Sequence, residues 1–283
     1  MPPLRVAFCP HPPVIVPELA GGAAAELDEL RRAATDAVRS LVDCSAERIV
    51  VIGTDDPSTD LDPTTAPDPT ERVWRPPLSA SFRPWGAAVD VPLGASLDPA
   101  APAFGATSTG ACGRLPLSLT VAAWLLTRAG VDPAGTTVEM VAVPAGTPPE
   151  QCRQRGRLLA GSAAAGPGTV ARPWAALVMG DGSACRGLAS PGYQDARAEP
   201  FDDEVAAALA TADHRRLARL DSALAGALRV AGRAAWQVAA GSVAAGATNG
   251  GAAVGDVIDW TGRLTYYAAP YGVAYFVASW DRN

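Results

Sequence analysis

The stretch from Trp174 to Gly187 (WAALVMGDGSACRG) constrains the fold of this chain more than any other. An uninterrupted apolar run, Ala175 to Met179, leads directly into the loop Gly180-Asp181-Gly182-Ser183. A short apolar run that ends in a glycine loop is typical of a buried strand in a parallel sheet. In open α/β sheets, ligands bind beyond the carboxyl ends of the strands. We therefore expect this loop to lie beside a ligand site.

Two earlier segments have the same form, a short apolar strand followed by polar residues. Residues 4–9 (LRVAFC) precede Pro-His11-Pro-Pro, and residues 48–53 (RIVVIG) precede Thr54, Asp55 and Asp56. Between them, residues 17–42 carry apolar side chains at helical spacing, namely Leu27, Leu30, Ala34, Val38 and Leu41. The pattern predicts a right-handed βαβ unit.

The rest of the chain continues to alternate between helical and strand patterns. We expect helices over residues 115–129, 148–164, from 200 onward and 223–245, and strands over 89–91, 137–143, 254–260, 263–268 and 271–280. This order predicts an α/β fold in which a single domain spanning 1–283 holds a largely parallel central sheet flanked by helices. Residues 55–80 are rich in Pro, Asp and Thr, and predict a long surface loop, either a lid or a solvated excursion. Residues 104–114 predict a second loop.

Composition excludes several classes of function. The net charge of −6 and the pI near 5.0 argue against a nucleic-acid-binding surface. No stretch reaches the roughly 18 apolar residues of a membrane span, and a strand predicted from residue 4 leaves no room for a signal peptide. The five cysteines are widely spaced and form no CxxC pair. We therefore expect a cytoplasmic protein that meets neither nucleic acid nor membrane.

Candidate site residues cluster after the predicted strands. His11, Asp55 and Asp181 each follow a strand, and three such groups at one sheet edge could hold a divalent metal; the alternative for Asp55 and Asp56 is that they cap turns. The other histidine, His214, lies in an arginine-rich helical surface, where we expect it to be solvated.

Other readings of the Gly180–Gly187 loop fail on sequence. A nucleophile elbow around Ser183 needs glycines where Asp181 and Cys185 stand, and a P-loop needs a lysine, which the chain lacks. Gly180-Asp181-Gly182-Ser183 therefore predicts a tight turn in which both glycines let the backbone approach a ligand. Cys185 is either a reactive thiol or a buried cysteine.

The order of these features resembles the subunit-B domain of class III extradiol ring-cleavage dioxygenases, a superfamily that includes the Memo-type proteins. The resemblance rests on HPPVIVPEL after the first strand, VVIGTDDP at the second, GDGSACRG with PFDDEVAAAL downstream, and VAGRAAWQVAAG before the terminal strands. It implies non-haem Fe(II), held by two histidines and a glutamate, that opens a catechol ring with O2, and a further histidine that acts as acid and base.

This chain departs from that pattern at most positions. His11 matches the first histidine ligand, Asp55 is the nearest substitute for the second, and residues 231–233 hold no carboxylate for the third. The acid/base histidine falls near Ala184 and is absent, although Asp181 could still contact a substrate.

Two hypotheses follow from these departures. In the first, an enzyme has a remodelled site: His11 and Asp55 hold Fe(II) or another divalent metal, Asp181, Ser183 and Cys185 are catalytic, and Thr54, Asp56, Gly180 and Gly182 contact a small-molecule ligand. In the second, a metal-free pseudoenzyme binds a ligand or a protein partner and has no cofactor. Approach of His11, Asp55 and Asp181 to within about 5 Å would favour the first, because metal–ligand bonds are near 2 Å. Divergence, or an arginine in the gap, would favour the second. The resemblance and the alanine-rich helices are both compatible with a homodimer.

Overall fold

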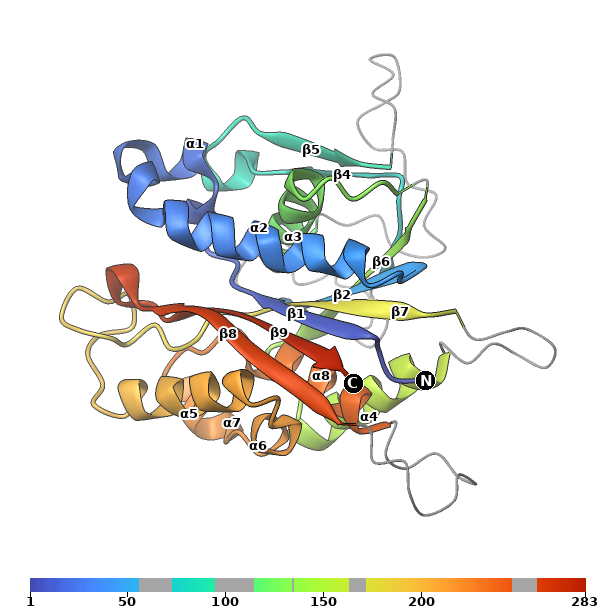
Figure 1. Ribbon diagram of the computed structural model, residues 1–283. Coiled ribbons are helices and arrows are strands. Elements are labelled where there is room, and N and C mark those ends of the chain that lie inside the picture. Colours follow the sequence, from blue (N-terminus) through green and yellow to red (C-terminus); the bar gives the residue numbers. More distant parts are fainter. Residues whose placement is uncertain (56–72, 95–114, 134, 163–171, 246–258) are drawn as a thin grey trace, which may run out of the picture.

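A seven-stranded sheet lies at the centre of the computed structural model, which describes residues 1–55, 73–94, 115–133, 135–162, 172–245 and 259–283 (Figure 1). Its strands, in spatial order, are β3 (Val73–Trp74), β6 (Thr137–Pro144), β2 (Arg48–Asp55), β7 (Trp174–Met179), β1 (Arg5–Cys9), β9 (Tyr275–Arg282) and β8 (Trp260–Ala268). The inner strands β6, β2, β7 and β1 are parallel, whereas β3 and β9 run antiparallel to their neighbours. The predicted α/β fold with a largely parallel sheet is confirmed, with antiparallel additions at both edges.

Helices cover both faces of this sheet (Figure 1). One face carries α2 (Asp28–Asp43) and α3 (Leu117–Arg128), beside the small hairpin of β4 (Leu78–Ser81) and β5 (Asp90–Leu93). The other carries α4 (Pro149–Ser162), α5 (Ala198–Ala210), α6 (His214–Ala218), α7 (Ser222–Ala227) and α8 (Arg233–Ala244). The described chain is thus one three-layer α/β domain.

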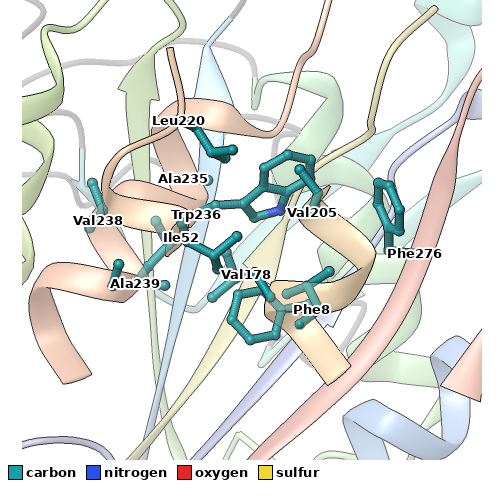
Figure 2. Close-up of a cluster of buried hydrophobic side chains, with 14 of the residues drawn as sticks. Phe8, Ile52, Val178, Val205, Leu220, Ala235, Trp236, Val238, Ala239 and Phe276 are labelled. Carbon is teal, nitrogen blue, oxygen red and sulfur yellow. The ribbon is translucent and has the colours of Figure 1, made fainter. Parts of the chain in front are cut away.

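Side chains alternate between two apolar cores, as the period of two along a strand requires. On β7, Ala176 and Val178 face the core beneath α8, while Ala175 and Leu177 face the core beneath α2 and α3. Figure 2 shows the α8 side, where the Trp236 indole packs among apolar side chains from β1, β2, β7 and α5. On the opposite face, the five apolar residues predicted to line one stripe are all buried. Because both faces are covered, β7 is buried throughout and β1 and β2 are buried except at their ends, whereas β6 keeps several residues exposed or half-buried.

The helix predicted over residues 223–245 is wrong, because two helices occupy this stretch. The helix α7 ends at Ala227 and α8 begins at Arg233. Between them, Arg229 has a left-handed φ of +55°, and the N–H groups of Arg229 and Val230 donate to the carbonyls of Gly226 and Ala225. This is a Schellman motif, which usually has glycine at the left-handed position. Because arginine occupies that position, the break between α7 and α8 could not be predicted from a glycine at the helix end.

Smaller differences concern the first helix, the long loop and the last strand. Residues 17–27 form a short helix, α1 (Pro17–Ala20), and the 3₁₀ segment η2 (Gly21–Leu27) before α2 begins. The 55–80 segment includes β3 and the start of β4, and its residues 56–72 lie outside the described part of the chain. The predicted strand at 271–280 begins only at Tyr275, after the 3₁₀ turn η6 (Pro270–Gly272).

Two further predictions fall outside the described residues, and the one for His214 is wrong. The 104–114 loop and the proposed strand residues 254–258 are not described. His214 is half-buried rather than solvated, and this burial lowers the pKa of its imidazole. Within the described residues, no helix is both long and apolar enough to cross a bilayer.

Candidate functional site

The loop after β7 begins beside the carboxyl end of β1, at the end of these strands that lies farthest from the two chain termini (Figure 1). Cys9 and Met179 are paired at the ends of these parallel strands, and the Gly180 N–H donates to the Cys9 carbonyl (2.9 Å). Directly beyond, the His11 N–H donates to Asp181 Oδ1 (2.7 Å). The structure therefore brings together two of the predicted site residues.

His11 and Asp181 form a pair that is mostly removed from solvent. Their side chains are 8% and 13% exposed, and His11 Nδ1 lies 3.7 Å from Asp181 Oδ1. That distance exceeds a hydrogen bond, and Nδ1 has no hydrogen-bond partner among the described residues. Burial raises the pKa of the Asp181 carboxyl, and the nearby His11 only partly opposes this shift. An unpaired buried polar atom beside a desolvated carboxyl is unusual in a purely structural contact.

The two glycines of the loop are required for close packing. A Cβ on Gly180 would lie 2.5 Å from the Gly232 Cα, and one on Gly182 would lie 2.7 Å from a Phe276 ring carbon. The Gly182 N–H donates to the Ala274 carbonyl, and the Gly232 N–H donates to the Asp181 carbonyl. The loop is thus fixed between the α7–α8 connection and the start of β9. Both glycines are therefore explained by close packing within this chain, without a ligand.

Ser183 points away from Asp181, into a buried polar network. Its N–H donates to Asp202 Oδ1 (2.9 Å) and its hydroxyl donates to Asp202 Oδ2 (2.5 Å). Both residues are 0% exposed. Arg186 Nη1 lies 3.5 Å from Asp202 Oδ2 and also donates to the Tyr267 hydroxyl. The contacts of Ser183 therefore tie the loop to α5, rather than presenting a nucleophile.

Cys185 is also enclosed by the protein. It is 1% exposed, and its Sγ lies 3.4 Å from the Gly192 carbonyl oxygen and 3.5 Å from that of Leu228. Burial raises the pKa of the thiol. A raised pKa disfavours the thiolate, which is the reactive form, so the environment of Cys185 is that of a structural cysteine.

Asp55, at the end of β2, forms no metal-binding group with this pair, since the described residues contain no cluster of three His, Cys, Asp or Glu side chains placed to hold a metal. Pairing of β2 with β7 ends at Ile52, and from Gly53 to Asp55 the strand continues along β6. Thr54 is buried, and its carbonyl accepts a hydrogen bond from Ser118 Oγ (2.7 Å). Asp55 accepts a hydrogen bond at its carbonyl from Ala145, and Asp56 lies outside the described residues.

A cavity of about 400 Å³ opens beside Asp181. Its walls come from four parts of the chain that are distant in sequence: the segment after β1, the loop after β7, the α7–α8 connection, and the turn before β9 with the start of that strand. The lining residues are Pro12, Pro13, Val14, Asp181, Gly182, Ala184, Pro191, Arg229, Ala231, Tyr271, Val273 and Tyr275. The walls are thus mainly apolar, and the lining residues with polar side chains are Asp181, Arg229, Tyr271 and Tyr275.

Sequence reasoning missed Arg229 and the tyrosines of this cavity. Arg229 and Tyr271 both adopt left-handed φ angles, +55° and +59°, a conformation uncommon for residues with large side chains. The Tyr271 hydroxyl donates to Glu26 Oε2 (2.6 Å), which ties η6 to the segment after β1. Tyr275 is buried, and its pKa is raised by this burial and by the charge of Asp181. A tyrosine-rich turn before a terminal strand was the only signal in sequence.

The residues present do not fit the iron site that the resemblance implies. The described residues contain no group of three or more His, Cys, Asp or Glu side chains placed to hold a metal. Arg233, within the stretch assigned to the third ligand, is 4% exposed and donates to the Thr147 carbonyl (2.6 Å), to Gln237 Oε1 (3.1 Å) and to the Ala145 carbonyl. A buried cation therefore stands where a carboxylate ligand was expected, next to the segment that follows β6.

A larger depression, about 680 Å³, lies on the helical face between the start of α4 and the α6–α7 segment. Its lining includes Arg153, Arg215 and Arg219. Arg153 is already engaged by the Ala218 carbonyl and by Glu150, and Arg215 and Arg219 are exposed side chains. The strand-end cavity, which is lined by Asp181 of the mostly buried His11–Asp181 pair, is the better candidate.

Comparisons with known proteins assign no family to the chain. No family model matches it, and no curated protein matches its sequence.

Proposed function

We propose that this protein binds a small polar or aromatic molecule in the strand-end cavity and does so without a metal ion. On this proposal the chain is a divergent relative of the class III extradiol dioxygenases, with their subunit-B fold, and its site has become a ligand pocket. The observation that carries the proposal is Asp181, whose carboxylate belongs to a mostly buried pair with His11 and which lines the cavity. Burying a charged group is costly unless it is paired and hydrogen-bonded, so a carboxylate with an oxygen left unbonded beside a cavity favours a ligand as its partner.

The size and lining of the cavity support a small-molecule ligand. Ligand pockets are typically about 300–1,000 Å³, with mainly apolar walls and a few convergent polar groups. The cavity here has a volume of about 400 Å³ and the same division between apolar and polar lining. It also lies at the carboxyl ends of β1 and β7, where ligands of α/β proteins bind.

Backbone strain supports the same location. Tyr271 and Arg229 hold left-handed φ angles and both line the cavity. Such conformations cost about 1–3 kcal/mol each and cluster at ligand clamps and active sites. Replacing Arg229 by glycine would satisfy the Schellman motif with less strain, so the presence of an arginine at this position favours a role for its side chain.

A pocket-filling substitution tests the proposal. Ala231 lines the cavity and is only half-buried, so Ala231→Phe should fill the space while the protein remains folded. Ala227→Phe is the matched control, because Ala227 is exposed on the neighbouring helix α7. Saturation-transfer NMR with catechol, benzoate, tyramine and L-phenylalanine should detect binding of at least one probe to the wild type and to Ala227→Phe. That signal should be lost in Ala231→Phe.

Two outcomes would overturn the proposal. Absence of binding by all four probes, or equal binding to the wild type and Ala231→Phe, would remove the ligand pocket. The proposal also states that no metal ion takes part. The metal content of the purified protein, measured before and after anaerobic incubation with Fe(II), tests this claim. Stoichiometric metal that His11→Ala abolishes would favour a remodelled metalloenzyme instead.

A further inference from the structure

The strand-end cavity carries opposite charges at two separate places. Both Asp181, whose side chain is 13% exposed, and Arg229, which is exposed, line the cavity. The two come from different loops, the one after β7 and the one between α7 and α8. Within the described residues they form no ion pair with each other, and the polar groups of both remain available to a ligand.

The Asp181 carboxylate has one oxygen left for a ligand. Oδ1 accepts the His11 N–H, whereas Oδ2 accepts no hydrogen bond from any described residue and is not among the buried unpaired atoms. An accessible carboxylate oxygen in a mainly apolar cavity favours a hydrogen-bond donor, and a cationic donor most strongly. An ammonium group meets both requirements, whereas a purely anionic ligand would leave the carboxylate unpaired and repelled.

Arg229 provides the complementary group. A guanidinium has five N–H donors, and the described contacts of Arg229 use one nitrogen, Nη1, which donates to the Pro191 carbonyl (3.3 Å). No described acidic residue lies within ion-pair distance of it. Its aliphatic part packs over Gly192, where an added Cβ would lie 3.2 Å from the Arg229 Cδ. The side chain is thereby positioned at the cavity, and its other donors remain for a carboxylate.

The walls between these two charges are apolar. They include Pro12, Val14 and Val273, with Tyr275 on the start of β9. Resting on the ligand-binding role proposed above, we propose that the cavity takes a small amino carboxylate with an apolar or aromatic body. Its ammonium group pairs with Asp181, its carboxylate pairs with Arg229, and its body packs against the proline, valine and tyrosine walls. An amino acid of the size of phenylalanine has this chemistry.

Three matched probes separate the two charge contacts. L-Phenylalanine carries both charged groups, phenethylamine carries only the ammonium, and 3-phenylpropionate carries only the carboxylate. Isothermal titration calorimetry at pH 7 should give the wild type at least tenfold higher affinity for L-phenylalanine than for either partial probe, since each charge-assisted contact contributes about 1.5–3 kcal/mol. Two variants then assign the contacts.

Asp181→Asn keeps an oxygen for the His11 N–H but removes the charge. It should lower the affinity for L-phenylalanine and for phenethylamine at least tenfold, and leave the affinity for 3-phenylpropionate unchanged or higher. Arg229→Gln should lower the affinity for L-phenylalanine and for 3-phenylpropionate, and leave the affinity for phenethylamine unchanged. Arg229 is exposed, so this variant keeps the test valid if Asp181→Asn fails to fold. Arg219→Gln, which removes an exposed arginine in the other depression, is the control and should change nothing.

The outcomes separate this inference from the function on which it rests. If 3-phenylpropionate or catechol binds the wild type as tightly as L-phenylalanine, and Ala231→Phe abolishes that binding, the pocket stands and the amino carboxylate assignment is overturned. If none of the probes binds, both fail. Unchanged phenethylamine affinity in a folded Asp181→Asn variant would also overturn the assignment.

Discussion

Two carboxylates are associated with the loop after β7: Asp181 within the loop and Asp202 on α5. They differ in how many hydrogen bonds their oxygens accept. Asp202, from α5, is 0% exposed and has both oxygens occupied by the backbone N–H and the hydroxyl of Ser183, with Arg186 at 3.5 Å. Asp181 receives one hydrogen bond from the His11 backbone and borders a cavity. Burial raises the pKa of both carboxyls, so a titration shift alone does not distinguish a structural carboxylate from a binding one. The distinguishing feature is the unused hydrogen-bonding capacity.

That difference assigns separate tasks to the two sides of one short loop. The Ser183 side fixes the loop to α5 and, through Arg186, to Tyr267 on β8. The fixed loop then holds Asp181 at the end of β7 with an oxygen facing the cavity. A rigid support of this kind is what positions a binding group accurately.

The largest effect expected from this comparison is on stability. Asp202→Ala leaves the Ser183 N–H and hydroxyl buried without an acceptor and should cost about 3–5 kcal/mol in the free energy of unfolding. Asp181→Ala removes one hydrogen-bond acceptor beside a cavity that water can enter, and should cost about 1 kcal/mol. Urea denaturation followed by circular dichroism measures both values. Equal costs for the two variants would contradict the division into a structural and a binding carboxylate.

A smaller effect is expected at Ser183, which the sequence suggested as catalytic. Ser183→Ala removes a hydroxyl that donates to a carboxylate, and should lower the free energy of unfolding by about 1.5–3 kcal/mol without changing probe affinity. Ser190→Ala is a matched control, because the Ser190 hydroxyl donates to the neutral Gly187 carbonyl (2.8 Å) and should cost only about 1 kcal/mol. If Ser183→Ala instead left stability intact and abolished binding, Ser183 would belong to the cavity.

The parts of the fold that repeat a simple period could be predicted from the sequence. The strands β1, β2, β6 and β7 appear as short apolar runs, and the buried stripe of α2 follows helical spacing. Because the ends of neighbouring parallel strands meet, the same reasoning predicted that His11 and Asp181 lie together. It failed for Asp55, which forms no metal-binding group with His11 and Asp181 among the described residues; β2 extends beside β6 as far as Asp55, beyond the point where its pairing with β7 ends.

The remaining half of the site depends on tertiary structure that leaves no periodic signal. Arg229 reaches the cavity because a Schellman motif ends α7 with arginine in the glycine position. Tyr275 reaches it because the last strand returns antiparallel beside β1. A helix that began at residue 200 would place Asp202 in its exposed first turn, but α5 begins at Ala198 and the Asp202 carboxylate accepts the Ser183 hydroxyl in the interior. In each case the partner that decides the role is distant in sequence.

The smallest expected effect is a pH dependence of stability that belongs to Asp202. Burial raises the pKa of Asp202 in the folded protein above the unfolded value, although the Ser183 hydrogen bonds and the Arg186 charge act in the opposite direction. A second titratable group nearby is the Cys185 thiol. Between the unfolded and folded pKa values the native state binds more protons, so the contribution of Asp202 to stability is fully present below the unfolded pKa and is lost as pH rises through the folded pKa. Exposed pairs such as Asp195–Arg197, where the arginine lowers the pKa of Asp195 to about 2, give the opposite slope of stability against pH.

The free energies of unfolding of the wild type and Asp202→Asn, measured from pH 3 to pH 8, differ by the pH-dependent contribution of Asp202. The wild type should lose stability relative to the variant from about pH 4 upward, whereas a constant difference would mean that the Asp202 carboxyl titrates alike in both states and that its buried contacts fully offset its desolvation.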